Sequence, residues 1–219
     1  MLAAPSRRAP FNLAGKRDTQ QIIQFPLDVK TWLARPPRVE EARPCRCPRC
    51  DAASRPAGGG LVIWGHGLRE RQLRGPSEPG GPPGLIVLLI RRYLCRNCGA
   101  ILTVVPRGVA RAKHFAATAI AFSLALFGID RLPAFKVREA VNDCRIVGAT
   151  AASTWATLRR WIGAIHRGVL WPSLPRLAEP STPRRIAERA AMALSAAATP
   201  TLAGLPLSHL AFHGGAHMA

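Results

Sequence analysis

Two pairs of cysteines carry the most definite chemistry in this chain. The members of each pair are separated by two residues: Cys47 with Cys50, and Cys95 with Cys98. Two C-x-x-C pairs can together supply four thiolates to one tetrahedral ion, and zinc is the usual occupant of such a closed site. A closed site stabilises the fold and leaves no open position for catalysis. The spacing therefore predicts one structural Zn²⁺, with iron in a rubredoxin-like site as the alternative metal.

The two remaining cysteines fit this pattern less well. Cys45 lies two residues before Cys47 and could replace it as a ligand, whereas Cys144 is expected to be a small buried residue. A redox-active C-x-x-C opens a helix after a strand, and neither pair has that context. Residues 1–10 carry two arginines and two prolines where a secretory signal needs an apolar segment. We expect a cytoplasmic, reducing location, where metal binding is favoured over disulfides.

The charge indicates the class of partner. The chain has 219 residues, with 31 Lys+Arg against 12 Asp+Glu and a formal net charge of +19, and 27 of the basic residues are arginine. Because the planar guanidinium group suits phosphates and base edges, DNA is the expected partner. Two alternatives would produce a similar composition: a protein that binds an anionic membrane surface, and a GC-rich genome that favours arginine codons.

The sequence contains no pattern that indicates catalysis or a membrane span. Beyond residue 167 only Glu179 and Glu188 are acidic, so the three carboxylates of a two-metal nuclease or transposase core are lacking. The most apolar run, residues 115–129, is shorter than the roughly 20 residues that cross a bilayer. We therefore expect a buried core helix there, and a protein with neither an enzymatic activity nor a small-molecule substrate.

The periodicity predicts an α+β fold. A small zinc-ribbon β module is followed by a helical, helix-turn-helix-like segment, because β-branched strands give way to a helical period after Pro106. The expected parts are a lead-in at residues 1–44, a zinc ribbon with a Pro/Gly-rich insert at 45–112, a helical DNA-binding segment at 113–170 and a Pro/Ala-rich tail at 171–219.

Individual elements follow from the same patterns. Strands are expected at residues 21–25, 61–64, 85–94 and 101–105, and helices at 28–34, 113–127, 133–142, 151–167 and 183–198. Residues 75–84 are expected to be a flexible loop without ladder hydrogen bonds. The last twenty residues are expected to be poorly ordered. There, His209, His213 and His217 would form a metal-binding face on a helix, but Gly214 and Gly215 interrupt it.

The helix expected at residues 151–167 has two different faces. At about 100° per residue, one face is apolar and the opposite face carries Ser153, Thr157, Arg160 and Arg167. Hydroxyl and guanidinium groups suit the major groove of DNA, with the helix at 133–142 as the first half of a helix-turn-helix. The connecting residues 143–150 are longer than a usual turn. The alternative is an ordinary amphipathic helix with a solvated arginine face.

A second basic surface flanks the second cysteine pair. Residues 91–113 contain six basic residues and no acidic one. On a strand, Arg91 and Tyr93 share a face and Arg92 lies on the other, so a phosphate backbone could meet basic groups beside an aromatic ring on which bases stack. A solvated edge strand protected by its charge is the alternative. His66, in Gly65-His66-Gly67, is expected in a turn.

These motifs resemble the zinc-binding N-terminal region of bacterial transposases and of related uncharacterised mobile-element proteins. The similarity covers about residues 45–115 and rests on the two cysteine pairs, Gly65-His66-Gly67, Arg74-Gly75, Arg91-Arg92-Tyr93 and Val104-Val105-Pro106. In that family a helical DNA-binding segment follows the ribbon, and residues 153–161 look like its recognition helix. The resemblance implies that the metal ligands are Cys47, Cys50, Cys95 and Cys98, and that Arg91, Arg92 and Arg160 contact DNA. The family's ribonuclease-H-like catalytic domain is missing here.

The sequence therefore favours a non-enzymatic, zinc-stabilised DNA-binding protein. The alternative is a protein-interaction adaptor whose zinc ribbon docks on a larger nucleic-acid-processing complex. Binding to DNA separates the two, because only the first neutralises phosphates and loses affinity linearly with the logarithm of the salt concentration.

Overall fold

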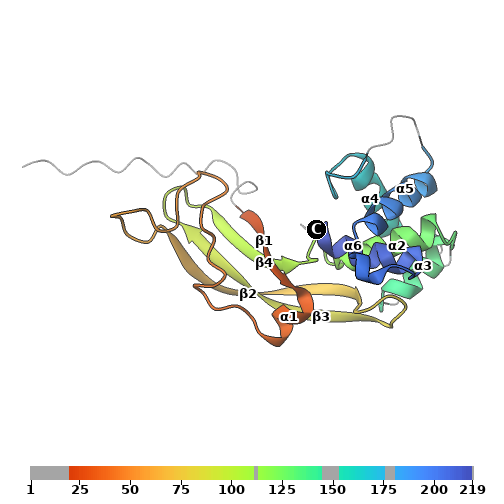
Figure 1. Cartoon of the computed structure of the whole chain (residues 1–219), viewed down its shortest axis with the longest axis horizontal. Coiled ribbons are helices and arrows are strands. Elements are labelled where there is room, and N and C mark those ends of the chain that lie inside the picture. The colour runs from red at the N-terminus through yellow and green to blue at the C-terminus, as the bar shows by residue number, and fades with distance from the viewer. Residues whose placement is uncertain (1–19, 111–112, 145–152, 176–180, 219) are drawn as a thin grey trace, which may run out of the picture.

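The computed structural model describes residues 20–110, 113–144, 153–175 and 181–218, and these residues form two lobes (Figure 1). A four-stranded sheet makes up one lobe, and the helices that follow it in the chain make up the other. Each lobe has its own cluster of buried apolar side chains. The fold is therefore mixed α+β, as the periodicity predicts. Within the described ranges, no helix combines the length and apolar character needed to cross a membrane.

The sheet includes the strand that was expected to be a lead-in. It consists of β1 (Gln20–Asp28), β2 (Ile63–Pro76), β3 (Pro83–Cys95) and β4 (Ile101–Arg107), in the order β1-β4-β3-β2. β1 runs parallel to β4, and the other neighbours are antiparallel. The short helix α1 (Val29–Ala34) follows β1, and Asp28 caps it by accepting a 2.8 Å hydrogen bond from the N–H of Thr31.

The hairpin of β2 and β3 is much longer than the sequence predicts. The strands stay in register as far as Gly75 opposite Gly84 and Pro76 opposite Pro83. The expected loop at 75–84 is therefore wrong, since only residues 77–82 lie outside the two strands. Most β2 side chains are exposed because β2 is an edge strand, and its charged residues conceal the alternating pattern that marks a strand.

A β-bulge interrupts β2 near its start. The register slips between Gly65 and Leu68, where β2 has one residue more than β3. Gly67 has a φ of +83°, in the left-handed region that glycine adopts readily. His66, which was expected in a turn, lies exposed within this bulge. The bulge, and not a hairpin turn, explains Gly67, whereas a Cβ at Gly65 would lie 3.2 Å from Cγ1 of Val39.

The helical lobe is built around one central helix. Its elements are α2 (Ala117–Gly128), α3 (Ala134–Val141), α4 (Ala156–His166), α5 (Pro183–Ala196), a 3-10 turn at Pro200–Leu202 and α6 (Leu207–His217). α2 is buried on almost every side, which confirms the core helix expected at residues 115–129. The expected start of α4 at 151–152 and most of the connection at 143–150 lie outside the described residues. The helix-turn-helix therefore stays a prediction.

α6 shows that the expectation of a poorly ordered end was wrong for residues 207–217. A Cβ at Gly214 would lie 1.8 Å from the carbonyl oxygen of Leu194 on α5, and a Cβ at Gly215 would lie 2.5 Å from the Cβ of Ala121 on α2. α6 therefore packs so closely that only glycine fits at these two positions. Burial of Ala211 and Phe212 offsets the roughly 1 kcal/mol that each glycine costs inside a helix.

The last residues of β2 connect the sheet to the helical lobe. The backbone N–H of Arg74 donates to the carbonyl of His114 at 2.7 Å, and the N–H of Ala116 donates to the carbonyl of Arg74 at 2.9 Å. Gly75 has a φ of +126°, and a Cβ there would lie 2.3 Å from the Cβ of Ala119 on α2. The two lobes thus meet at a backbone contact that leaves no room for a side chain.

Candidate metal centre

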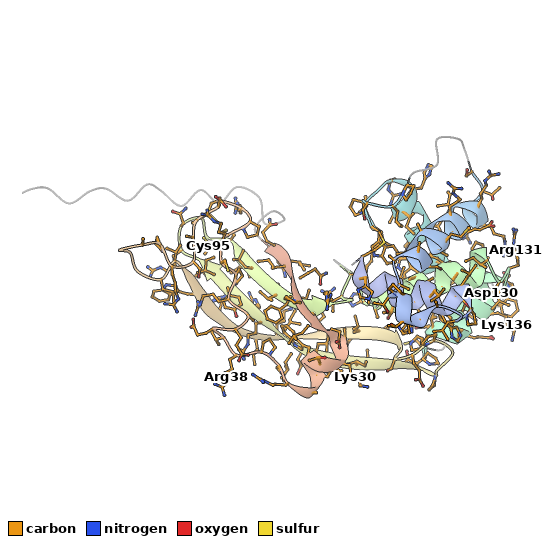
Figure 2. All side chains as sticks on the ribbon, viewed as in Figure 1. Lys30, Arg38, Cys95, Asp130, Arg131 and Lys136 are labelled. Atoms are coloured by element: carbon orange, nitrogen blue, oxygen red, sulfur yellow. The ribbon has the colours of Figure 1, made fainter. Side chains whose placement is uncertain are left out.

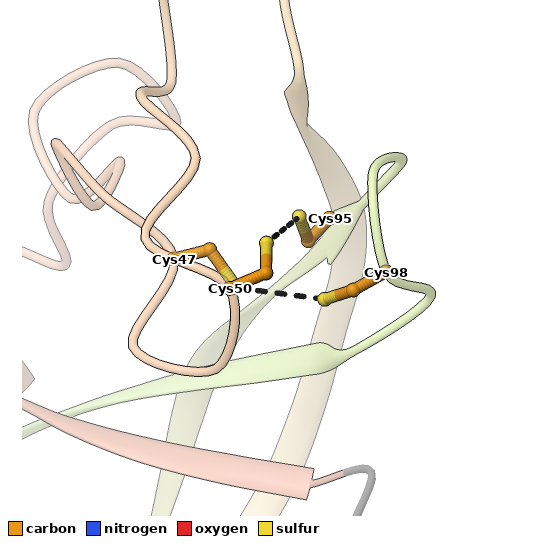
Figure 3. Close-up of side chains that lie close together, drawn as sticks. All are labelled: Cys47, Cys50, Cys95 and Cys98. Carbon is orange, nitrogen blue, oxygen red and sulfur yellow. Dashed lines mark hydrogen bonds between the residues drawn. The ribbon is translucent and has the colours of Figure 1, made fainter.

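The two cysteine pairs meet at the end of the sheet that is remote from the helical lobe. In Figure 2, Cys95 lies at that end, whereas Arg131 lies in the helical lobe. The four thiols face one another in Figure 3. Their sulfur atoms lie within 4.8 Å of one another, and the separations from Cys47 to Cys98 and from Cys50 to Cys95 are each 3.7 Å. The loop before β2 and the end of β3 thus bring residues 45 positions apart into one cluster.

The sulfur spacing fits a tetrahedral ion. Four thiolates bound at about 2.3 Å would place their sulfurs about 3.8 Å apart, close to the two 3.7 Å separations. All four cysteines are free of disulfide bonds. Cys47 and Cys95 are buried and the second member of each pair is half-buried, so the site is largely closed by protein. The cluster could therefore hold one metal ion with all four ligands supplied by the chain.

The two pairs have the same backbone geometry. The carbonyl of Cys47 accepts a hydrogen bond from the N–H of Asp51, and the carbonyl of Cys95 accepts one from Gly99, both at 2.8 Å. In each pair the N–H of the first cysteine donates to the carbonyl five residues later, at 3.0 and 2.9 Å. The residue after the second cysteine has a positive φ, +56° at Asp51 and +72° at Gly99. These repeated turns direct both thiols of a pair to the same side.

The other cysteines lie apart from the cluster. Cys45 is exposed and is not one of the four grouped thiols, so the geometry favours Cys47 over the alternative ligand. Cys144 is also exposed, beside Asp143 and the guanidinium group of Arg74, so the expectation of a small buried residue was wrong. It lies beyond the end of α3, where the chain has left the apolar face of that helix.

Hydrogen bonding and burial shift the pKa values of three of these thiols in opposite directions. The amide of Asn97 donates to Sγ of Cys50 at 3.4 Å and lowers the pKa of that thiol to about 6. Burial raises the pKa of Cys95 and raises that of Cys98 to about 12. A divalent cation among the sulfurs would favour the thiolate at every position. Metal binding should therefore release protons from Cys95 and Cys98.

Arginine side chains form hydrogen bonds that hold the loop with Cys47 and Cys50 against the sheet. Arg43 donates two hydrogen bonds to the carboxylate of Glu40 and another to the carbonyl of Ile63 at the start of β2. Arg55 donates to the same carboxylate at 2.7 Å. Hydrogen bonds from Arg43 and then Arg55 lower the pKa of Glu40 to about 2. The Arg43 side chain is only 7% exposed. These contacts position the loop independently of any metal ion.

Tyr93 belongs to this supporting layer, so its predicted role in stacking on bases was wrong. The residue is 1% exposed, and its hydroxyl donates to the carbonyl of Val39 at 2.7 Å. The guanidinium group of Arg43 lies 5.6 Å from the ring centroid. Strand alternation predicts which face of β3 carries Tyr93. It does not show that the chain before the first cysteine pair covers that face.

The arginines predicted to contact DNA from the ribbon are also partly buried. Nε of Arg91 donates to the carbonyl of Pro37, and Nε of Arg92 is buried without a hydrogen-bond partner. Arg96 is exposed, and its guanidinium group lies 4.5 Å from the ring centroid of Trp64. Arg111, from the same basic segment, lies outside the described residues. The side chains of Arg91 and Arg92 are thus less accessible to DNA than the sequence predicts.

The predicted DNA-binding face of α4 is accessible. Leu158, Trp161, Ile162 and Ile165 are buried. On the opposite side Arg160 and Arg167 are exposed and Thr157 is half-buried. Ser153 is exposed too, but it precedes α4, so the expected helix is wrong at residues 153–155. Arg159 is exposed as well, although the angular analysis did not include it. It lies about 100° from Arg160 around the helix, so a wider definition of the face would have found it.

The exposed arginines of α4 and the four thiols lie in different lobes and form two separate candidate sites. The first offers positive charge to a ligand, and the second offers soft donor atoms to a metal. No protein-family model, curated protein or solved structure matches this chain.

Proposed function

We propose that the chain is a zinc-stabilised DNA-binding protein without catalytic activity, related to the DNA-binding regions of transposases. The exposed face of α4 carries the proposal, because Arg159, Arg160 and Arg167 lie on it while the other side of the helix is buried. Among the described residues, no acidic side chain forms an ion pair with any of these three arginines. Their charge is available to neutralise phosphates.

The shape of α4 supports the same proposal. Ala156, Arg160, Gly163 and Arg167 fall within about 60° of one another around the helix axis. Ala156 lets the start of the helix approach a groove closely, while the guanidinium groups of Arg160 and Arg167 lie on the same face. A Cβ at Gly163 would lie 3.2 Å from Nη1 of Arg167, so that guanidinium group lies over the glycine. The major groove, roughly 12 Å wide, admits an α-helix that presents such a face.

We assign the cysteine cluster to Zn²⁺ in a structural role. Zinc favours four thiolates in a tetrahedral site, and the sulfur spacing supports that arrangement. Metal analysis of the purified protein should find one Zn²⁺ per chain. Cys47→Ser should lose the metal and Cys45→Ser should retain it. Equal metal content in both variants, or no metal with every thiol free to react, would contradict the assignment.

Binding to labelled duplex DNA over a series of salt concentrations tests the DNA proposal. The logarithm of the affinity should fall linearly with the logarithm of the salt concentration, and each lost phosphate contact should reduce the slope by about 0.9. Arg159→Ala and Arg160→Ala should weaken binding. Arg38→Ala is the matched control, because it removes one exposed positive charge from the loop after α1, in the sheet lobe (Figure 2).

Selection from a random DNA library tests the role of Arg160 in particular. A bidentate contact to a guanine contributes about 1–3 kcal/mol of discrimination, so Arg160→Ala should relax the preference at one base pair. If the wild type and the variant select the same motif, α4 is a solvated face and does not recognise bases.

Incubation with supercoiled plasmid and Mg²⁺ should leave the plasmid uncut, and nicking that persists through repurification would contradict the non-catalytic assignment.

A protein-interaction adaptor is the second candidate, and the β2–β3 hairpin favours it. Leu68, Leu85, Val87 and Leu89 are 44–50% exposed. Leu85, Val87 and Leu89 occupy alternate positions of β3. Arg91 is the next position in that series, and Leu68 on β2 lies directly opposite it, so all four apolar side chains share one face of the hairpin. An exposed aliphatic face of this kind suits a protein partner. Zinc-loaded protein that fails to bind DNA at low salt would favour the adaptor.

A further inference from the structure

α6 brings together three histidines that neither the cysteine cluster nor α4 uses. His209, His213 and His217 recur every four residues, a spacing that places neighbours on one face of a helix, about 6 Å apart along its axis. Gly214 and Gly215 face α5 and α2. The glycines that seemed to interrupt a histidine face therefore hold the helix in place and leave that face accessible.

The three imidazoles form two overlapping pairs and cannot all reach one ion. His209 and His217 are eight residues apart, which separates them by about 12 Å along the helix. His213 belongs to both pairs. Two histidines at i and i+4 on a helix are a known arrangement for binding Zn²⁺. The geometry thus allows one ion between adjacent turns, with His213 as one of its ligands.

Burial and ring packing favour the first pair. His209 and His213 are half-buried, whereas His217 is exposed. The His209 ring packs edge-on to Phe122 with 6.3 Å between centroids, and the His213 ring packs edge-on to Phe212 at 5.4 Å. Because these packed rings have already lost part of their rotational freedom, they lose less of it on binding an ion than the exposed His217 would.

The charged groups near His213 influence which ions can bind. His213 borders a groove of about 480 Å³ that separates α6 from the sheet, and the charged groups lining this groove are Asp28, Lys30, Arg74, Glu78 and Arg107. Since basic groups outnumber acidic ones there, a cation held by charge alone is disfavoured. An ion that bonds to nitrogen is favoured.

We propose that His209 and His213 bind one divalent transition-metal ion of the class that prefers imidazole, which includes Ni²⁺, Cu²⁺ and Zn²⁺. Water completes the coordination, because two side chains supply only two ligands. The bound ion joins two successive turns of α6 beside its contacts with α2. This site is separate from the cysteine cluster in position, donor atoms and accessibility, and it does not depend on DNA binding.

Ni²⁺ titrated into the full chain loaded with one equivalent of Zn²⁺ tests the site by calorimetry, because the four thiolates hold that zinc more tightly than two imidazoles could. We expect about one Ni²⁺ per chain with no loss of zinc. His209→Ala and His213→Ala should each weaken binding at least as much as loss of a hydrogen-bond partner to a ligand does, about 10- to 100-fold. His217→Ala, the matched control with the same spacing on the same helix, should stay within about threefold of the wild type.

Further measurements separate ligation from folding. His213→Gln keeps a polar side chain of similar size, and its circular dichroism should match the wild type while Ni²⁺ binding is lost. Binding to the wild type should also weaken as the pH falls through the imidazole range, because only the neutral ring is a ligand. The proposal is overturned if the variant lacking both His209 and His213 binds Ni²⁺ like the wild type, or if His217→Ala loses as much affinity as His213→Ala.

Discussion

Gly75→Ala should destabilise the protein more than most single-methyl substitutions, for two reasons that can be separated. The residue has a φ of +126°, and a Cβ there would lie 2.3 Å from the Cβ of Ala119. A residue forced into a sparsely populated backbone conformation costs about 1–3 kcal/mol, and overpacking costs about 1–3 kcal/mol more. The free energy of unfolding should therefore fall by about 2–6 kcal/mol.

Gly84→Ala is the matched control for this substitution. Gly84 lies directly opposite Gly75 in the hairpin, has no atom within 4 Å of a built Cβ, and does not have a positive φ. Its substitution should leave stability unchanged or raise it by up to about 1 kcal/mol, because alanine restricts the unfolded chain. Urea unfolding of the zinc-loaded protein, followed by tryptophan fluorescence, measures both variants.

A double-mutant cycle with Ala119→Gly separates the steric contact from the backbone strain. Ala119→Gly alone should cost about 1 kcal/mol through helix propensity. In the Gly75→Ala background the same cost is offset by relief of the overpacking, so the two effects of Ala119→Gly should differ by about 1–3 kcal/mol. The strain at position 75 remains. The reasoning fails if Gly75→Ala changes stability by less than about 0.5 kcal/mol, or if Ala119→Gly has the same effect in both backgrounds.

Three further substitutions test local features of the fold through the free energy of unfolding. Leu88→Ala should cost about 2–5 kcal/mol because Leu88 is fully buried. The neighbouring Leu89 is exposed, so Leu89→Ala should change the free energy by less than about 0.5 kcal/mol. Equal effects would mean that the strand faces are misassigned. Gly99→Ala should cost about 1–2 kcal/mol because its φ is +72°, and Gly60→Ala, in open space, should cost less. Asp28→Ala should cost about 1 kcal/mol at pH 7. The Thr31 N–H lowers the pKa of Asp28, so this stabilisation is present above the ordinary carboxyl pKa and is lost as the pH falls; thermal unfolding of variant and wild type should converge in acid, and a constant difference would exclude the cap.

Features determined by neighbouring residues could be predicted from the sequence. The two C-x-x-C pairs each form a tight local turn, so their chemistry and internal geometry follow from a few adjacent residues. α5 begins at Pro183, and Thr182 caps it by accepting a 3.3 Å hydrogen bond from the N–H of Arg185, a pattern visible in the sequence. The apolar run that forms α2 predicts a buried helix by its length and composition alone.

Features determined by distant contacts could not be predicted in the same way. Glycine occupies position 214 of α6 because the backbone of α5 leaves no room there for a side chain. No residue close to it in the sequence indicates this contact. Tyr93 is buried because the chain near Val39 folds over it. The end of β2 looks like a loop because its prolines and glycines pair only with those of β3. In each case the partner segment decides the structure.

The length of the β2–β3 hairpin limits how far it could contact a DNA duplex. A strand of 14 residues at about 3.3 Å per residue spans about 45 Å, more than the roughly 34 Å of one turn of B-DNA. A duplex lying along the hairpin from the cysteine cluster to the helical lobe would be protected over more than one turn. Deleting two residues from each strand would keep every side chain on its own face and shorten the hairpin by about 7 Å, the rise of about two base pairs. The edge of a nuclease footprint should move by the same amount.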